Sequence, residues 1–354
     1  MDKFAFIIHP LKLEDYSKKF NWVKKVPDNI LKSVARVLPP FKVSHITGIK
    51  SRTGRKVEGY FVACPLTSKQ MLTLPEKEVI NKIIKTGKKA ESLGVDIIGL
   101  GAFTSVVGDK GITVAQNLDT PVTTGNTYTV ATAIEGTEMA VKKMKLDLKK
   151  ETTTVIGATG SIGRTASILM AEKVNKMILA ARNIKKLSEL KKEIKAKFPD
   201  MEIEISSNVK NAVSKSRVII SASGSADTLV EPEDLLSRSV ICDVARPRDV
   251  AARVEESRDD VLVIEGGIVK VPGDVNFNFD FGYPPGTSYA CMAETIILTL
   301  EKMFFNYTLG PKVELDKVKE MWSLAEKHGF KVVKLRKYSQ KSFAKELLYS
   351  EAFL

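Results

Sequence analysis

The sequence predicts an α/β protein built around a doubly wound parallel sheet, and three observations support this fold class. Short apolar, β-branched runs recur along the chain and alternate with amphipathic segments of helical period. A glycine-rich turn directly follows one of these runs, at residues 157–163, and a helix is predicted to begin in it. The length of 354 residues is enough for two domains. Together these features predict a Rossmann-like domain beside a second α/β domain.

The order of the predicted elements divides the chain into three parts. Residues 1–150 are expected to form an N-terminal α/β substrate domain. Residues 151–285 are expected to form an NADP-binding Rossmann-like domain. Residues 286–354 are expected to form a helical C-terminal segment that packs back on the N-terminal domain.

The first part is predicted to mix strands and helices. Strands are expected at 4–8, 41–49, 56–63, 95–100 and 112–115, and the turn SRTGR makes the second and third a hairpin. Helices are expected at 11–38, with an interruption near Pro27 and a stop at Pro39, and at 75–93. A further helix is expected to open at TTGNT and to run through Met144. The turn TTGNT at 123–127 is typical of a ligand-binding turn and equally of an N-cap, to which Thr124 or Asn126 would contribute.

The glycine turn has the spacing of a phosphate-binding turn between a strand at 152–156 and a helix. Gly157 allows a tight turn, Gly160 allows backbone N–H groups to approach a pyrophosphate, and Gly163 allows close packing of helix on strand. The helix N-terminus adds a partial positive charge. We therefore expect the whole turn to bind the cofactor, through the three glycines with Thr159, Ser161 and Ile162. The alternative is a glycine-rich turn in a nucleotide-free domain.

The residue after the next strand, 178–181, indicates the type of cofactor. NAD-preferring sites usually carry Asp or Glu here to bind the ribose hydroxyls, whereas this chain has Arg182 with Lys185 and Lys186 close by. A guanidinium suits a 2′-phosphate, so the sequence predicts NADPH.

The rest of the second part continues the alternation of strands and helices. Strands are expected at 202–206, 217–222, 240–244 and 261–265, with helices at 185–198 and 208–215. Ligands of such sheets lie beyond the carboxyl ends of the strands, so Ser223 is expected to bind the cofactor. Asp243 and Gly266 are expected at the same rim, although Asp243 could equally cap its own loop.

Cys291 is the cysteine with the most suggestive position. Helices are predicted at 289–305, 313–328 and 339–348, and if Ser288 caps the first of them, Cys291 lies in its first turn. The helix dipole there favours a thiolate. By position alone Cys291 could also be a small core residue. A nucleophilic cysteine and a hydride donor in one chain suggest reduction of a thioester through an acyl-cysteine.

Composition limits the partners and the compartment. The formal net charge of +13 and pI near 9.4 favour a polyanion or an acidic protein partner, although lysines at helical spacing among acids are also typical of a solvated helix face. No nucleic-acid-binding motif, metal-ligand spacing or apolar run long enough to span a bilayer is present in the sequence. The expectation is a cytoplasmic protein without metal.

Several stretches in order resemble the long-chain fatty acyl-[acyl-carrier-protein] reductases, the aldehyde-forming enzymes best known from cyanobacteria. The matching stretches include IIHPLKLEDY, LTLPEKEVINKIIKTGKKAESLGVDIIGLGAFTSVV, TTGNT, GATGSIGRTAS, IEGGIV and YACMAETIILTLE. The motif at 291–294 falls where that family has its acyl-accepting cysteine, so the resemblance implies this role for Cys291. It departs at DVARPRDV, 243–250, which resembles a turn of glutamyl-tRNA reductases, and at 275–288.

The resemblance implies NADPH-dependent reduction of a long-chain acyl thioester to a fatty aldehyde. The acyl donor would be an acidic acyl carrier protein or acyl-CoA, and an aldehyde-consuming enzyme would be a further partner. Donors from TTGNT or from the helix N-terminus would stabilise the oxyanion. His9 and His328 are candidates for the general acid, although a histidine at the end of an element is more often structural.

Three alternatives stay open. A glutamyl-tRNA-reductase-like enzyme would also use a cysteine and NADPH, but in that class the cysteine lies in the N-terminal domain, and Cys64 lacks that setting. A shikimate-dehydrogenase-like enzyme would need no cysteine. A non-catalytic NADP-binding protein would use its basic face to hold an acidic partner.

Overall fold

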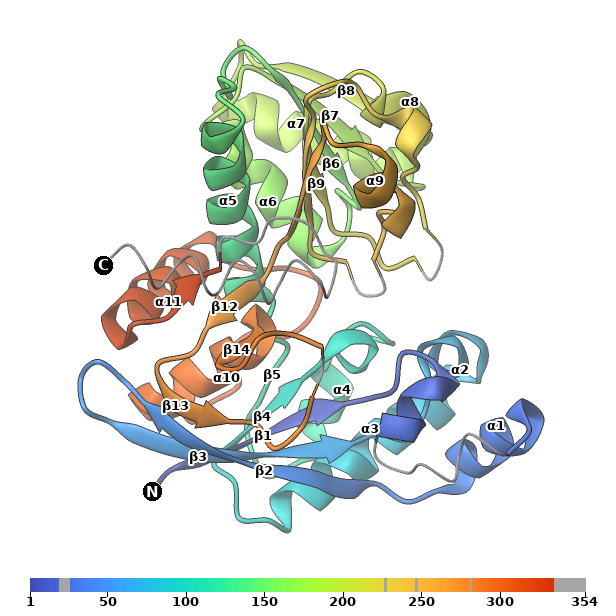
Figure 1. Cartoon of the computed structure of the whole chain (residues 1–354), viewed down its shortest axis with the longest axis vertical. Helices are drawn as coiled ribbons and strands as arrows, with labels where there is room; N and C mark the ends of the chain where they lie inside the picture. Colours follow the sequence, from blue (N-terminus) through green and yellow to red (C-terminus); the bar gives the residue numbers. More distant parts are fainter. Residues whose placement is uncertain (19–25, 226–227, 246–247, 281, 334–354) are drawn as a thin grey trace. The chain divides into compact units, whose positions relative to one another are not determined.

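The structure is a computed structural model that describes residues 1–18, 26–225, 228–245, 248–280 and 282–333 (Figure 1). The chain forms two compact units. The first unit comprises residues 1–128, 269–313 and 320–331. Of the described residues, the second unit comprises 129–268, 314–319 and 332–333.

The second unit contains a six-stranded, fully parallel sheet. Its strands are β6 (Thr152–Ile156), β7 (Lys176–Ala180), β8 (Glu202–Ser206), β9 (Val218–Ser221), β10 (Val240–Asp243) and β11 (Leu262–Glu265). Their order across the sheet is β8-β7-β6-β9-β10-β11, and every neighbouring pair is parallel. Numbered from β6, this is the order 3-2-1-4-5-6 of a Rossmann sheet. The predicted fold class is confirmed.

Helices cover both faces of this sheet, as a doubly wound fold requires. Figure 1 shows α5 (Asn126–Lys143), α6 (Ser161–Ala171) and α7 (Ile184–Lys197) on one side, with α8 (Val209–Val213) and α9 (Ala252–Ser257) on the other. Alternate strand residues explain the two layers. Ile219 and Ile241 pack with Val254 of α9, while Val218 and Val240 pack with Val141 of α5.

The first unit contains a six-stranded mixed sheet in the order β13-β2-β3-β1-β4-β5. The strands are β1 (Lys3–Ile8), β2 (Phe41–Lys50), β3 (Lys56–Ala63), β4 (Ile97–Leu100), β5 (Val122–Thr123) and β13 (Gly273–Asn276). β1 is parallel to β3 and β4, whereas β2 is antiparallel to β3 and to β13. The predicted hairpin at 41–63 is therefore present.

Two long helices cover the opposite faces of this sheet (Figure 1). On one face α3 (Glu76–Glu91) packs Val79 and Ile83 against Ala5 and Ile7 of β1. On the other face α10 (Ala290–Glu301) contacts β1, β3 and β4. The shorter elements are η1 (Leu13–Lys18), α1 (Asp28–Val37), α2 (Ser68–Thr73), η3 (Ala102–Ser105) and α4 (Ile112–Gln116).

The segment expected to be a strand at 112–115 is helical, so that prediction is wrong. Gly111 has a left-handed φ of 88°, which turns the chain, and the Asp109 carboxylate accepts the N–H and the hydroxyl of Thr113. This cap satisfies the first turn of α4. A short apolar run does not by itself distinguish a strand from a helix.

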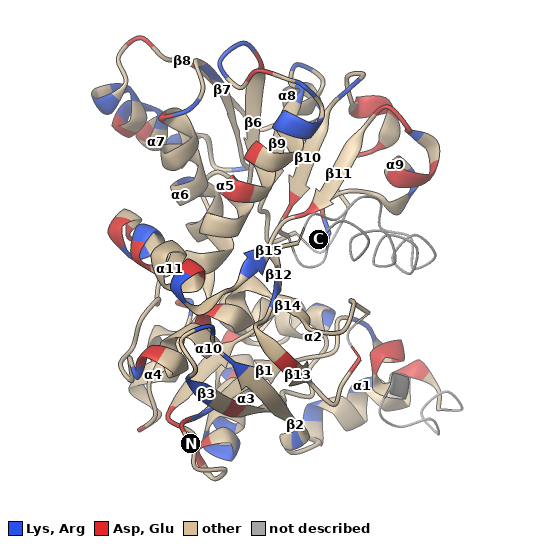
Figure 2. Ribbon diagram, turned by 60° about the vertical axis from the view of Figure 1, so that its left-hand side comes forward, with Lys and Arg blue, Asp and Glu red and all other residues tan. Residues whose placement is uncertain are grey.

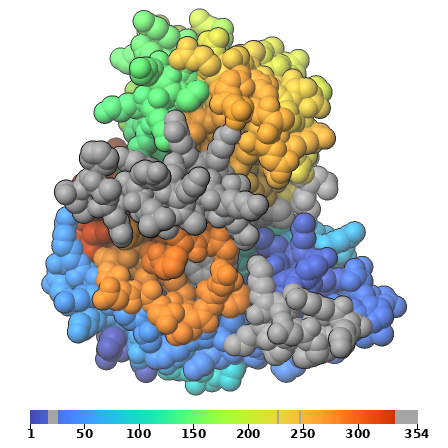
Figure 3. Space-filling model, viewed as in Figure 1, coloured from blue at the N-terminus to red at the C-terminus, as the bar shows by residue number. Residues whose placement is uncertain are grey.

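The compact units divide the chain at other positions than the expected ranges 1–150, 151–285 and 286–354. Helix α5 lies mostly in the second unit, and residues 269–285 belong to the first, because β13 pairs with β2. Figure 3 shows the orange surface of the residues near 270–290 beside the blue surface of N-terminal residues.

The C-terminal part adds short elements and one long helix. β12 (Ile268–Lys270), β14 (Thr287–Tyr289) and β15 (Lys331–Val332) form a small sheet in the order β14-β12-β15. α11 (Leu315–His328) follows α10, and η4 (Pro232–Asp234) belongs to the second unit. The expected helix at 339–348, part of the expected helix at 11–38, and part of DVARPRDV lie outside the described residues.

Candidate active site and cofactor site

Cys291 is the second residue of α10 and lies in the first unit. Cys291 as a residue is partly exposed, whereas Cys64 and Cys242 are buried. The expected first-turn position is therefore present, but the expected cap is not. Tyr289 occupies the N-cap position without a side-chain cap, and the Ser288 hydroxyl donates to the Tyr289 carbonyl at 3.2 Å.

Two close approaches place the α10 N-terminal half against the sheet and against TTGNT. Gly125 has a φ of +74°, and a Cβ on it would lie 2.3 Å from the Cα and the Cβ of Cys291. One turn further along α10, a Cβ on Gly99 of β4 would lie 2.1 Å from the Thr295 hydroxyl. Both positions require glycine, because any side chain would displace α10.

Glu294 is fully buried one turn after Cys291 and connects α10 to TTGNT. Its Oε1 accepts from the Thr123 hydroxyl at 2.6 Å and from the Thr308 hydroxyl at 3.1 Å. Its Oε2 accepts from the backbone N–H of Tyr128, in the first turn of α5, at 2.9 Å. Burial raises the pKa of Glu294, and the hydrogen bonds oppose that rise.

The threonine hydroxyls of TTGNT form hydrogen bonds to buried groups of the protein. Thr123 binds Glu294, Thr124 donates from its hydroxyl to the Thr308 carbonyl at 3.1 Å, and the Thr127 hydroxyl is bonded to that of Thr308. Glu294 thus supplies, from another helix, the N-terminal cap of α5 that Thr124 or Asn126 was expected to supply. Glu294 is the last residue of the motif at 291–294, but no local pattern in the sequence indicates this role.

The predicted glycine turn lies in the second unit, between β6 and α6. Gly157 has a φ of +73°, and a Cβ on it would lie 2.5 Å from the Ala222 carbonyl oxygen. A Cβ on Gly163 would lie 2.2 Å from the Gly157 carbonyl oxygen. Gly160 is the N-cap of α6, and its N–H donates to the Gly157 carbonyl at 2.8 Å. The turn also contains Thr159, Ser161 and Ile162. This geometry fits a pyrophosphate at the helix N-terminus.

Arg182 follows β7 and is exposed, at the position that contacts the ribose in Rossmann domains. The next residue, Asn183, caps α7 by accepting the N–H of Lys186 at 3.0 Å. The cap fixes the path of the chain beside Arg182. Figure 2 shows acidic and basic residues interspersed along α7, as in a solvated helix face.

Ser223 follows β9 beside the glycine turn, and a Cβ on Gly157 would lie 2.9 Å from its Cα. Its hydroxyl donates to the buried Asp249 carboxylate, which also accepts from the Ser221 hydroxyl and from the Ser223 N–H at 3.1 Å. Asp243 accepts from the N–H groups of Ala245 and Val250, so it caps its own loop. In the described part of DVARPRDV, both aspartates therefore support the loops beside the turn.

The two histidines considered as general acids are held in structural contacts. His9 accepts from the Phe103 N–H at Nε2 and donates from Nδ1 to the Pro10 carbonyl, and burial lowers its pKa to about 4. His328 is buried between the Ser51 hydroxyl at 2.7 Å and the Glu301 carboxylate at 2.5 Å. Neither arrangement favours a proton donor at neutral pH.

Two absences hold within the described residues. No group of His, Cys, Asp and Glu there has the arrangement of a metal site. No helix there is long and apolar enough to cross a membrane.

Sequence comparisons find a dehydrogenase family and two relatives. Residues 138–265 match the family described as Shikimate / quinate 5-dehydrogenase. The chain is 29% identical over 353 residues to the aminotransferase PigE of Serratia sp. (strain ATCC 39006), covering 96% of this chain and 40% of that protein. It is 26% identical over 312 residues to the long-chain acyl-[acyl-carrier-protein] reductase of Synechococcus elongatus, covering 84% of this chain and 89% of that protein. The chain therefore spans well under half of PigE and most of the reductase.

The matches to solved structures are weaker than those to the two sequence relatives. L-tryptophan dehydrogenase of Nostoc punctiforme has a TM-score of 0.44 at 10% identity, covering 99% of this chain and 88% of that one. Quinate dehydrogenase of Corynebacterium glutamicum, solved with NAD, has a TM-score of 0.37 at 8% identity, covering 91% of this chain and 98% of that one.

The sequence matches and the strand order agree on one coarse conclusion. The dehydrogenase match covers β6 to β11, the strands that form the Rossmann sheet around the glycine turn. Together with the reductase relative, it supports an oxidoreductase that uses NAD(P).

Proposed function

We propose that this chain is an NADPH-dependent reductase that converts a long-chain acyl thioester to an aldehyde through an acyl group on Cys291. The observation that carries the proposal is the placement of a partly exposed cysteine in the first turn of α10, in contact with Gly125. The acyl-[acyl-carrier-protein] reductase relative, which spans most of both chains, supports the same reading.

The N-terminus of α10 provides chemistry suited to acyl transfer. The N–H groups of the first helical turn have no acceptor inside the helix, and they bring a partial positive charge close to the sulfur. This environment favours the thiolate that attacks the thioester carbonyl, and the donor leaves as a thiol. The threonine hydroxyls of TTGNT bond inward, so backbone N–H groups of α10 are the better candidates for stabilising the oxyanion.

The cofactor would be held by the second unit, whose glycine turn fits a pyrophosphate. Gly157, Gly160 and Gly163 with Thr159, Ser161 and Ile162 would cradle the phosphates, and Ser223 would line the loop beside them. Arg182 would pair with a 2′-phosphate, which favours NADPH over NADH. When bound, NADPH would supply the hydride for reduction of the acyl group. The bond between the Cys291 sulfur and the acyl carbon would then break, which would release the aldehyde and return the thiol of Cys291.

The proposed balance is that acyl thioester, NADPH and a proton give aldehyde, thiol and NADP⁺. The acyl donor would be an acyl carrier protein or acyl-CoA, and the product would pass to an aldehyde-consuming enzyme. A dehydrogenase that uses no cysteine is the second candidate, because the family match covers the Rossmann domain alone.

Aldehyde formation by matched cysteine variants tests the proposal. Cys291→Ala should lose at least about 1000-fold in turnover, since the covalent route disappears, while NADPH binding stays within about twofold. Cys242→Ala removes a thiol of the second unit and is the control. Turnover should also be faster with NADPH than with NADH. Undiminished turnover by Cys291→Ala would favour the cysteine-free dehydrogenase.

A further inference from the structure

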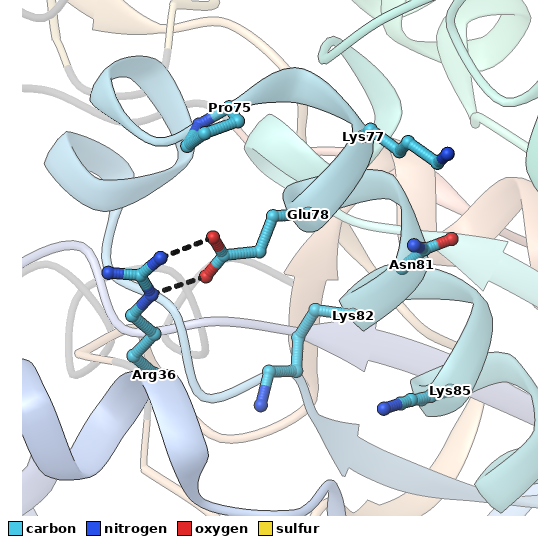
Figure 4. Close-up of a pocket in the computed structure, with 7 residues that line it drawn as sticks. All are labelled: Arg36, Pro75, Lys77, Glu78, Asn81, Lys82 and Lys85. Carbon is cyan, nitrogen blue, oxygen red and sulfur yellow. Dashed lines mark hydrogen bonds and ion pairs between the residues drawn. The ribbon is translucent and has the colours of Figure 1, made fainter.

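The first unit carries a basic depression that the proposed chemistry does not use. It has a volume of about 460 Å³ and lies between the end of α1 and the first turns of α3 (Figure 4). We call it the α1–α3 groove. Its lining residues are Arg36, Pro75, Lys77, Glu78, Asn81, Lys82 and Lys85.

Two contacts fasten the walls of the groove to each other. The Arg36 guanidinium donates to both carboxylate oxygens of Glu78, at 2.5 and 2.6 Å, so these two charges offset each other. Lys82 donates from Nζ to the carbonyl of Leu38, the C-cap of α1, at 3.0 Å. These contacts make the groove a formed feature of the fold.

The remaining cations form a row along α3 that faces outward. Lys77 and Lys85 lie on one exposed face of α3 with the neutral Asn81 between them, and the exposed Lys88 continues this face on the next turn. At 1.5 Å per residue the row is about 16 Å long. A small anion needs donors that converge on one point, whereas an extended row of charges suits an extended acidic surface such as a helix.

Exposed apolar side chains also occur on α1 and α2, the two helices that precede α3 in the chain. Ile30, Val34 and Val37 lie on one face of α1 and are 50%, 39% and 77% exposed, and Leu72 of α2 is 46% exposed. Exposed aliphatic residues beside charges are typical of a protein-binding surface. A surface that combines exposed lysines with exposed aliphatic side chains favours a folded acidic protein as the partner over a phosphate alone.

One loop connects the groove with the surroundings of Cys291. The loop after β4 packs on α3 at Gly108, where a Cβ would lie 2.7 Å from the Cδ1 of Ile80. The same loop packs on TTGNT at Gly111, where a Cβ would lie 3.4 Å from the Cγ2 of Thr124. The start of α3 and the Gly125–Cys291 contact therefore lie at the same edge of the first sheet.

We propose that the α1–α3 groove docks an acidic helix of the acyl carrier protein that delivers the acyl group. This inference rests on the proposed function and adds the surface that recognises the donor. Lys77, Lys85 and Lys88 would pair with carboxylates of that helix, and the α1 aliphatic residues would cover its apolar side.

The test compares two double variants. One reverses the charges of two exposed lysines in the row, and the other reverses two exposed lysines elsewhere. Lys77→Glu/Lys85→Glu in the full chain should weaken binding of a fluorescently labelled acyl carrier protein roughly 10-fold at low ionic strength. The control Lys192→Glu/Lys197→Glu makes the same net charge change on exposed lysines of α7 and should change binding less than about twofold. Equal weakening by the control would overturn the proposal, because overall charge alone would then explain binding.

Aldehyde formation from two donors separates docking from chemistry. The groove variant should lose roughly 10-fold in kcat/KM with acyl carrier protein and keep its activity with an uncharged acyl N-acetylcysteamine thioester. Loss with both donors would contradict a docking role. If the unmodified chain reduces neither donor, the proposed function fails. The binding titration still shows whether the groove binds acyl carrier protein. If Lys77→Glu/Lys85→Glu bound phosphatidylglycerol vesicles more weakly but bound acyl carrier protein unchanged, the groove would be a membrane-binding surface. That result would overturn the proposal.

Discussion

At the scale of single residues, Glu294 explains how the neighbourhood of Cys291 is held. A fully buried carboxylate is costly unless hydrogen bonds satisfy it, and here two hydroxyls and one backbone N–H do so. Its partners come from TTGNT, from α5 and from the segment after α10. One side chain thus keeps the Gly125 turn against the first turn of α10.

Replacing Glu294 should loosen this arrangement. Glu294→Ala leaves a buried N–H and two hydroxyls without their acceptor, and should lower the free energy of unfolding by about 3 kcal/mol. Glu294→Gln keeps one acceptor oxygen and should cost about half as much. Urea unfolding gives the values, and Thr299→Ala on the same helix, whose hydroxyl bonds only to the Thr295 carbonyl, is the control. Equal costs for Glu294→Ala and Thr299→Ala would show that the carboxylate does not hold the turn.

His9 should make stability depend on pH. In the fold its pKa is lowered to about 4 by burial, from 6.5 in the unfolded chain. As pH falls from 6.5 towards 4, the unfolded chain binds a proton that the folded chain does not, so this histidine lowers stability on the order of 1 kcal/mol per pH unit. His9→Gln should flatten that slope. Unfolding free energies measured at pH 7, 6 and 5 check this, and parallel slopes would contradict it.

At the scale of elements, the site depends on the approach of TTGNT to α10. Helix α10 is buried along almost its whole length. It packs closely on β4 because Gly99 has no side chain there. The absence of a side chain at Gly125 likewise allows the TTGNT turn to contact Cys291. The sequence shows the small residues, but not which helix they approach.

Gly125→Ala should therefore disturb the thiol more than a glycine substitution elsewhere. Its new Cβ would overlap Cys291, whereas Gly94, which also has a positive φ of +67°, has no atom within 4 Å of such a Cβ. In both variants the left-handed backbone conformation of the new alanine should lower the free energy of unfolding by about 1 kcal/mol. Only Gly125→Ala should slow alkylation of Cys291 by iodoacetamide, by roughly 10-fold or more. Equal alkylation rates in the two variants would refute the contact.

At the scale of the whole molecule, the Rossmann unit was the more predictable half. Its strands are continuous β-branched runs, and its glycine turn marks the start of α6 by local chemistry alone. The first unit was harder, because β13 joins β2 from more than 200 residues away and the strands β12, β14 and β15 are too short to show a pattern. Glu294 was missed for the same reason, since its role comes from contacts distant in sequence.

Intact-protein mass spectrometry can show whether Cys291 accepts the acyl group. The full chain is mixed with a long-chain acyl thioester in the absence of NADPH. If Cys291 accepts the acyl group, the mass of the protein should increase by one acyl group, mapped to Cys291 and released as aldehyde when NADPH is added. An adduct on another residue, or aldehyde formation by Cys291→Ala, would contradict it.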